Sequence, residues 1–269
     1  MASGRWADLR LRVASAAVLV PVAIACLWYG GVAFVLLAAI AAAGMGAEWG
    51  TIIGNPPAHW PGWLLPAGLA AATVLAGSGQ PAAAALVLLV AAALLAAVSP
   101  GRRAWSLAGV LYLGPTAIAL PWLRADPVAG FANVLFLLLL VWASDIGAYL
   151  VGRCVGGPKL APRISPGKTR SGAVGGLLAA IGVAWLAAHL LQPPAAAWPI
   201  VPLAAVLGVA AQAGDLFESW VKRHFGVKDS GRSIPGHGGL LDRLDAVLAV
   251  APLVAALALA AGRGVVIWQ

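Results

Sequence analysis

Most of the acidic residues in this chain of 269 residues gather in or beside two polar segments of an otherwise apolar sequence. They are Asp145, Asp215, Glu218, Asp229, Asp242 and Asp245. Asp242 and Asp245 are three residues apart, as are Asp215 and Glu218, and on a helix this spacing places both carboxylates of a pair on one face. Paired carboxylates suit Mg²⁺, which is usually held by one or two carboxylates together with substrate phosphates. The pairs therefore indicate a nucleotide and metal site, and the alternative is a surface salt bridge at the start of a helix.

The segment between these pairs carries residue types that bind phosphate. In chain order it contains Lys222, Arg223, Lys228, Asp229, His237, Gly238 and Gly239. Glycine lets backbone N–H groups approach phosphate closely, and Lys and Arg neutralise its charge. We expect catalytic side chains here, together with Asp242 and Asp245, although a lone histidine such as His237 is more often structural. The absence of a GxSxG motif argues against a serine hydrolase.

A second candidate for phosphate binding is SPGKT, from Ser165 to Thr169, which ends like a Walker A motif. The full motif requires glycine where Pro162 stands, and it follows a β-strand, whereas a long apolar segment precedes this one. We therefore predict a phosphate-binding loop of another kind, in which Ser165, Lys168 and Thr169 contact the phosphates of a nucleotide.

The composition indicates that these polar segments belong to an integral membrane protein. Apolar residues make up 62% of the chain and charged residues 10%, whereas a soluble domain is about half apolar and about a quarter charged. The basic residues behind the net charge of +8 are scattered among apolar runs, which argues against nucleic-acid binding. Cys26 lies in an apolar run and Cys154 in a polar segment, so the sequence offers neither a disulfide framework nor a CxxC metal pair.

Nine stretches approach the length of about 20 apolar residues that spans a bilayer. They are residues 13–29, 32–49, 62–77, 81–98, 104–123, 130–151, 171–191, 195–218 and 244–262. We therefore predict an all-α polytopic membrane protein with about nine transmembrane helices. Residues 1–130 would form N-terminal membrane helices, and residues 131–269 a catalytic membrane region with two loops, at 152–170 and 219–243. Asp145 lies inside the sixth stretch, and a carboxylate at membrane depth usually marks an ion or substrate site.

The distribution of Lys and Arg predicts the orientation in the membrane, because short cytoplasmic loops are enriched in both. With nine helices and the N-terminus inside, only Arg124 and Arg263 of the 17 basic residues fall on the outer side. This predicts that the N-terminus and both long polar loops are cytoplasmic. A cleaved signal peptide is the alternative for the first stretch, but a second apolar run follows directly after Gly31, which favours a helical hairpin.

Three blocks of the sequence resemble the motifs of phosphatidate cytidylyltransferases, also called CDP-diacylglycerol synthases. The block SWVKRHFGVKDSGRSIPGHGGLLDRLD, residues 219–245, is similar to the family signature. WASDIGAYLVGR (142–153) and LAPRISPGKT (160–169) resemble two further motifs in the expected order. The resemblance covers about the C-terminal half, and residues 1–130 are similar only in hydropathy. Ser171 stands where relatives commonly carry Glu, and Ala246 stands where they often have Ser.

The resemblance implies an enzyme that joins CTP to phosphatidic acid, forming CDP-diacylglycerol and pyrophosphate. It implies a multi-pass homodimer in the bacterial cytoplasmic (inner) membrane, with a polar cavity that faces the cytoplasm and opens sideways to lipid. It also implies Mg²⁺, with a monovalent cation such as K⁺ as an additional candidate. By motif position, Asp215 and Asp242 are the first candidates for metal ligands, followed by Asp245 and Asp145.

Two other functions compete with this interpretation. A CTP-dependent polyprenol or phytol kinase would use related chemistry, but it would transfer the γ-phosphoryl group and release CDP. A transporter would use Asp145 and Asp215 as coupling sites, but charged residues here concentrate on one predicted side rather than near the midplane. The DGxxAR motif of CDP-alcohol phosphotransferases is absent from the sequence.

Overall fold

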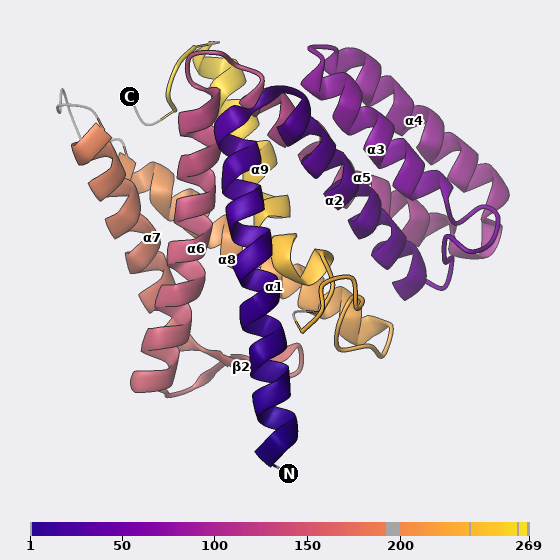
Figure 1. Ribbon diagram of the computed structural model, residues 1–269. Coiled ribbons are helices and arrows are strands. Elements are labelled where there is room, and N and C mark those ends of the chain that lie inside the picture. Colours follow the sequence, from indigo (N-terminus) through magenta and orange to yellow (C-terminus); the bar gives the residue numbers. More distant parts are fainter. Residues whose placement is uncertain (1, 192–199, 237, 263, 268–269) are drawn as a thin grey trace. The chain divides into compact units, whose positions relative to one another are not determined.

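The computed structural model of the protein describes residues 2–191, 200–236, 238–262 and 264–267 (Figure 1). Within these residues the chain forms nine α-helices, one short 3₁₀ helix and one two-stranded sheet. In chain order the elements are α1 (Ala2–Tyr29), α2 (Gly31–Ile52), α3 (Leu64–Gly77), α4 (Pro81–Val98), η1 (Pro100–Arg102), α5 (Arg103–Arg124), α6 (Gly130–Cys154), β1 (Lys159–Ala161), β2 (Ser165–Thr169), α7 (Arg170–Leu191), α8 (Ile200–His224) and α9 (Leu241–Ala261).

Each of the nine predicted apolar stretches corresponds to one α-helix, which confirms the all-α polytopic membrane fold. Seven of the described helices are long and apolar enough to span a membrane, and Ala17–Tyr29 and Leu64–Gly77 are shorter apolar helical segments. The first five residues of the eighth stretch, 195–199, lie outside the described residues. Helix α8 continues six residues beyond the predicted end at Glu218, so Lys222 and Arg223 lie on a helix rather than in a loop.

The chain divides into two compact units that are not contiguous in sequence. Unit 1 comprises the residues up to Ala125 together with Phe225–Leu244, and unit 2 comprises Asp126–His224 together with the residues from Asp245 onward. The predicted division near residue 130 is close to the first boundary. Residues Phe225–Leu244, which make up most of the signature block and are called the signature segment, nevertheless group with the N-terminal helices. Helix α9 begins in unit 1 and continues into unit 2.

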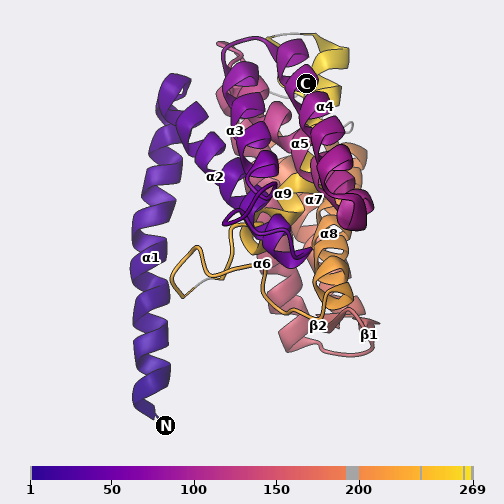
Figure 2. The same ribbon diagram turned by 90° about the vertical axis from the view of Figure 1, so that its right-hand side faces the viewer.

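In unit 1, helices α2, α3, α4 and α5 pack against one another, and Figure 2 shows α3 and α4 side by side. Trp49 is fully buried near the end of α2, and its indole N–H donates a 2.9 Å hydrogen bond to the carbonyl of Trp105 at the start of α5. Trp105 in turn makes an edge contact with Phe225. The end of α2, the start of α5 and the signature segment therefore lie together.

In unit 2, α6 and α7 pack closely because small residues face each other along both helices. A Cβ atom on Gly147 would come within 2.5 Å of the Ala179 methyl group, and one on Gly176 within 2.6 Å of the Ser144 carbonyl oxygen. Small residues at such an interface let the backbones of two membrane helices approach each other closely. Helix α8 joins the pair through Gln212, whose side-chain amide donates a 2.9 Å hydrogen bond to the Ala173 carbonyl.

The connection between α6 and α7 is a β-hairpin, which the sequence did not predict. Strands β1 and β2 pair antiparallel, with Lys159 opposite Thr169, and Figure 2 shows the hairpin at the ends of α6 and α7. Thr169 ends the hairpin and caps α7, because its hydroxyl accepts a 3.0 Å hydrogen bond from the backbone N–H of Gly172. The predicted phosphate-binding loop is thus largely an extended strand that leads directly into a helix.

Candidate active site

A cavity of about 580 Å³ lies in unit 2, between α6, α7, α8 and the hairpin. Its polar lining includes Asp145 from α6, Lys168 and Thr169 from β2, and Gln212 and Asp215 from α8. Tyr149, Gly152 and Arg153 extend the lining along α6. The volume falls within the range of about 300–1,000 Å³ that is typical of small-molecule sites. The structure therefore gathers two predicted metal ligands and two predicted phosphate-binding residues around one space.

Lys168 and Asp215 form an ion pair at this cavity, and both side chains are 28% exposed. Strand β2 carries Lys168 toward α8, and Asp215 lies nine residues before the end of that helix. Because both groups remain partly exposed, a phosphate or a cation can compete for either partner. Lys168 can therefore bind a phosphate group, and Asp215 can bind a metal ion that accompanies a nucleotide.

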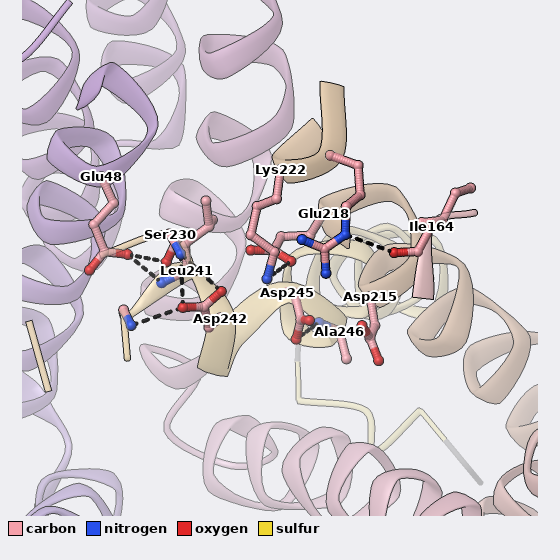
Figure 3. A network of polar contacts seen from close by, with 12 residues as sticks. Glu48, Ile164, Asp215, Glu218, Lys222, Ser230, Leu241, Asp242, Asp245 and Ala246 are labelled. Atoms are coloured by element: carbon pink, nitrogen blue, oxygen red, sulfur yellow. Dashed lines mark hydrogen bonds and ion pairs between the residues drawn. The ribbon is translucent and has the colours of Figure 1, made fainter. Parts of the chain in front are cut away.

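Asp245 lies within electrostatic range of the carboxylates of Asp145, Asp215 and Glu218. Figure 3 shows Asp245 with Asp215 and Glu218. Close packing of α8 on α9 brings them together, since a Cβ atom on Gly214 would lie 2.8 Å from the Asp245 carbonyl oxygen. One oxygen of the Asp245 carboxylate accepts a 2.8 Å hydrogen bond from the backbone N–H of Ala246. Unit 2 thus concentrates negative charge where α8 meets α9, and a cation would relieve the mutual repulsion.

Glu218 and Lys222 form a buried ion pair one turn apart on α8, with 2.6 Å between the ammonium nitrogen and a carboxylate oxygen. Their side chains are 1% and 11% exposed. The prediction placed Lys222 in a loop where it would neutralise substrate phosphate. In the structure its charge is already matched by Glu218, whereas Arg223 is exposed and donates a 3.2 Å hydrogen bond to the carbonyl of Ile164 in the hairpin.

The signature segment, Phe225–Leu244 in unit 1, folds around the start of α9. The carboxylate of Asp242 accepts hydrogen bonds from the backbone N–H groups of Ser230, at 3.0 and 3.2 Å, and Gly239, at 2.9 Å. Its predicted partner Asp245 belongs to unit 2, where it meets the carboxylates of α8. Asp242 therefore already has a structural task beside the metal-binding role that its position in the sequence suggests.

Comparison with known proteins identifies the family. Residues 10–260 match the model of the cytidylyltransferase family. The chain belongs to this family. The phosphatidate cytidylyltransferase of Brucella suis biovar 1 is 41% identical over 252 residues, which cover 92% of each chain. The phosphatidate cytidylyltransferase of Staphylococcus saprophyticus is 43% identical over 151 residues, which cover 56% of this chain and 57% of the relative.

In this cytidylyltransferase the predicted site residues fall into two groups. Asp145, Lys168, Thr169 and Asp215 line the cavity of unit 2, while Ser165 lies at the other end of β2. Lys228 and Asp229 are exposed in the signature segment of unit 1, and Gly238 and Gly239 precede α9 there. His237 lies outside the described residues.

The residues of this cytidylyltransferase fit Mg²⁺. Within the described part of the chain, no group of three or more His, Cys, Asp or Glu side chains is placed to hold a metal ion. Mg²⁺ needs no such cage, because one or two carboxylates, water and substrate phosphates complete its shell. Asp145 and Asp215 provide carboxylates at the cavity, and Asp245 lies within electrostatic range of both. An oxygen-only donor set of this kind suits a hard cation.

Sequence reasoning missed Glu48, near the end of α2. This carboxylate is 6% exposed and accepts four hydrogen bonds, all from the segment between Ser230 and Leu241. The only sequence signal was an acidic residue at the end of the apolar stretch 32–49. Its partners lie more than 180 residues further along the chain, so no local pattern could identify them.

Proposed function

We propose that this cytidylyltransferase transfers the cytidylyl group of CTP to phosphatidic acid, forming CDP-diacylglycerol and releasing pyrophosphate. The observation that carries the proposal is the cavity of unit 2, where Asp145, Lys168 and Asp215 meet in a membrane protein. The phosphatidate cytidylyltransferase of Brucella suis, whose name states this activity, is 41% identical to this protein over 92% of the chain. A helical membrane enzyme with phosphate- and metal-binding groups at a cavity suits one lipid substrate and one water-soluble nucleotide.

The reaction is an in-line displacement at phosphorus. A phosphate oxygen of phosphatidic acid attacks the α-phosphorus of CTP and forms a new P–O–P bond, while the bond from the α-phosphorus to the bridging oxygen breaks. Pyrophosphate leaves with that electron pair. A phosphate monoester has a second pKa of about 6 and is largely ionised near neutral pH, so no general base is needed. Catalysis then depends on positioning and charge neutralisation.

The predicted site residues, at the cavity and outside it, each have a defined task in this proposal. Lys168 exchanges its contact with Asp215 for a substrate phosphate, and Arg223 and Lys228 offset further negative charge. At the cavity, Asp145 and Asp215 are the candidates to hold Mg²⁺, which would supply charge neutralisation at the nucleotide phosphates. Asp245 in unit 2 and Asp242 in unit 1 are further candidates. A monovalent cation such as K⁺ at the same carboxylates remains part of the proposal.

The proposed function is tested with purified protein reconstituted in lipid vesicles that contain phosphatidic acid. We expect mass spectrometry to detect a lipid that carries cytidine only when CTP and Mg²⁺ are both present, with pyrophosphate in equal amount. A phosphorylated lipid together with CDP would instead assign the protein as a CTP-dependent lipid kinase. Solute uptake without any lipid product would favour the transporter.

We further propose that the protein lies in the bacterial inner membrane as a homodimer, with the cavity open to the cytoplasm. The orientation assumes that successive helices cross the membrane in opposite directions, and hydrogen bonds within unit 1 support this assumption. Arg124 at the end of α5 donates to the carbonyls of Leu27 and Trp28 at the end of α1, at 2.7 and 2.9 Å. The opposite end of α5 contacts the end of α2 through Trp49. The homodimer rests on the family resemblance alone.

The orientation predicts the reactivity of Cys154, which is exposed at the end of α6. A membrane-impermeant thiol reagent should label it strongly in inverted vesicles and weakly in intact cells, because the reagent reaches only one face of the membrane. The variant Cys154→Ser retains Cys26 and reports background labelling. Stronger labelling of Cys154 in intact cells would reverse the proposed orientation.

A further inference from the structure

Glu48 is the centre of a polar cradle that the signature segment builds within unit 1. One carboxylate oxygen accepts hydrogen bonds from the Ser233 hydroxyl at 2.5 Å and the Leu240 backbone N–H at 2.9 Å. The other accepts from the Ser230 hydroxyl at 2.8 Å and the Leu241 backbone N–H at 2.9 Å. Figure 3 shows Glu48 reaching Ser230 and Leu241 from its own helix. Every donor lies within twelve consecutive residues of the signature segment.

The cradle fits a carboxylate closely on two further sides. A Cβ atom on Gly231 would lie 2.8 Å from one oxygen of Glu48, and a Cβ atom on Gly239 would lie 2.5 Å from the other. The same Cβ atom on Gly239 would also clash with the hydroxyl oxygen of Ser230. Any side chain at either position would displace the carboxylate or the loop. The segment is therefore shaped around Glu48.

The charge of Glu48 is compensated by the start of α9. Leu240 and Leu241 supply two of the backbone N–H groups that a helix leaves without partners in its first turn. These groups carry the positive end of the helix dipole, which favours a carboxylate. Among the described residues, the partners of Glu48 are hydroxyl and backbone N–H groups, so its negative charge is matched by the loop itself. Replacing that charge weakens all four contacts together.

Glu48 and Asp242 hold the same loop from two helices. Ser230 donates its backbone N–H to Asp242 and its hydroxyl to Glu48. Gly239 donates to Asp242, and the next two residues of the chain donate to Glu48. A displacement of one carboxylate is therefore transmitted to the other through these shared residues. The orientation of Asp242, and of the first turn of α9 that carries it, depends on Glu48.

We propose that Glu48 is a positioning residue, which fixes the signature segment and the first turn of α9 so that Asp242 is held ready for the reaction. This inference rests on the proposed function. It assigns a catalytic contribution to the N-terminal half, where the sequence shows only hydropathy. Glu48 touches no substrate in this account and acts through the loop and through Asp242.

The test compares wild-type protein with Glu48→Gln, which keeps the size of the side chain but turns an amide N–H₂ toward two donors. We expect hydrogen exchange of residues 230–241 to accelerate about 10-fold or more, because local opening becomes easier. We expect kcat to fall about 10-fold or more, since small displacements from reactive geometry are costly, while KM for CTP stays within about threefold. The Mg²⁺ concentration for half-maximal rate should rise, and excess Mg²⁺ should restore part of kcat.

Asp126→Asn is the matched control. Like Asp242, Asp126 binds backbone N–H groups close to the start of a helix, since its carboxylate accepts 2.9 Å hydrogen bonds from Val128 and Ala129 in the turn before α6. It lies at the start of α6, whereas the cavity lies at the other end of that helix. We expect this variant to lose some thermal stability and to keep the wild-type kcat and Mg²⁺ dependence.

Two results would overturn the proposal. Unchanged exchange of residues 230–241 in Glu48→Gln would show that Glu48 does not hold the loop. Faster exchange with wild-type kcat and Mg²⁺ dependence would show that the loop position does not matter for catalysis. If Glu48→Gln does not fold, Ser233→Ala removes one of the four hydrogen bonds, and we expect smaller changes in the same directions. A wild-type protein without CDP-diacylglycerol synthesis would refute the proposed function, and the exchange measurement would still decide whether Glu48 holds the loop.

Discussion

Replacing Asp215 with asparagine is expected to lower kcat about 100-fold or more, which corresponds to about 2.7 kcal/mol of transition-state stabilisation. Asp215 lines the cavity of unit 2 and pairs with Lys168. Asparagine keeps the size and one carbonyl oxygen, but it removes the charge that attracts a divalent cation. Folding should change far less, because a partly exposed ion pair contributes only about 0–1 kcal/mol to stability.

The measurement is kcat over a Mg²⁺ titration, together with thermal unfolding in detergent, for wild type, Asp215→Asn and the control Asp126→Asn. We expect the Asp215 variant to unfold near the wild-type temperature and to need more Mg²⁺ for the little activity that remains. The control should match wild type in kcat. A folded Asp215→Asn protein with normal turnover and normal Mg²⁺ dependence would remove Asp215 from the active site.

Asp242→Asn is the second variant for which we expect a loss of about 100-fold or more in kcat. The structure makes this prediction sharper, because Asp242 also binds the backbone N–H groups of Ser230 and Gly239. Both N–H groups reach Oδ2, so a single asparagine oxygen in that place still accepts both hydrogen bonds, although each is weaker without the charge. The substitution therefore removes the charge that a metal requires and largely keeps the loop in place.

Comparison with Asp242→Ala separates the two tasks of this residue. Alanine removes the acceptors as well as the charge, so we expect it to lower both kcat and the unfolding temperature, whereas asparagine should lower kcat alone. If Asp242→Asn turns over like wild type and only Asp242→Ala is impaired, Asp242 holds the loop and does not bind metal. The proposed metal ligands would then be Asp215 and Asp145.

The membrane helices could be predicted because each apolar stretch satisfies its own backbone hydrogen bonds and needs no partner to be recognised. Hydropathy alone, however, did not predict the correct C-terminal end of α8. Hydropathy falls at Glu218, but the helix continues to His224, with Lys222, Arg223 and His224 in its last turn. Basic residues interact favourably with the C-terminal end of a helix, so they are compatible with a last turn that the hydropathy pattern does not predict.

The candidate site was predicted in its residue types and only partly in its arrangement. The spacing of Asp242 and Asp245 correctly placed both on α9, but one carboxylate binds the signature loop and the other meets the carboxylates of α8. The hairpin and the Glu48 cradle escaped prediction for a common reason. In both, the contacts join residues that are not neighbours in sequence, and such contacts produce none of the hydrophobic periodicity from which helices and strands are predicted.

The fate of each phosphorus of CTP tests the central claim most directly. Reconstituted protein is supplied with phosphatidic acid, Mg²⁺ and CTP labelled either at the α- or at the γ-phosphorus, and the lipid and aqueous products are separated. We predict that the α-label enters the lipid in equal amount to the pyrophosphate released, and that all γ-label released from CTP appears in pyrophosphate. Transfer of the γ-label to lipid, with the α-label left in CDP, would contradict cytidylyl transfer.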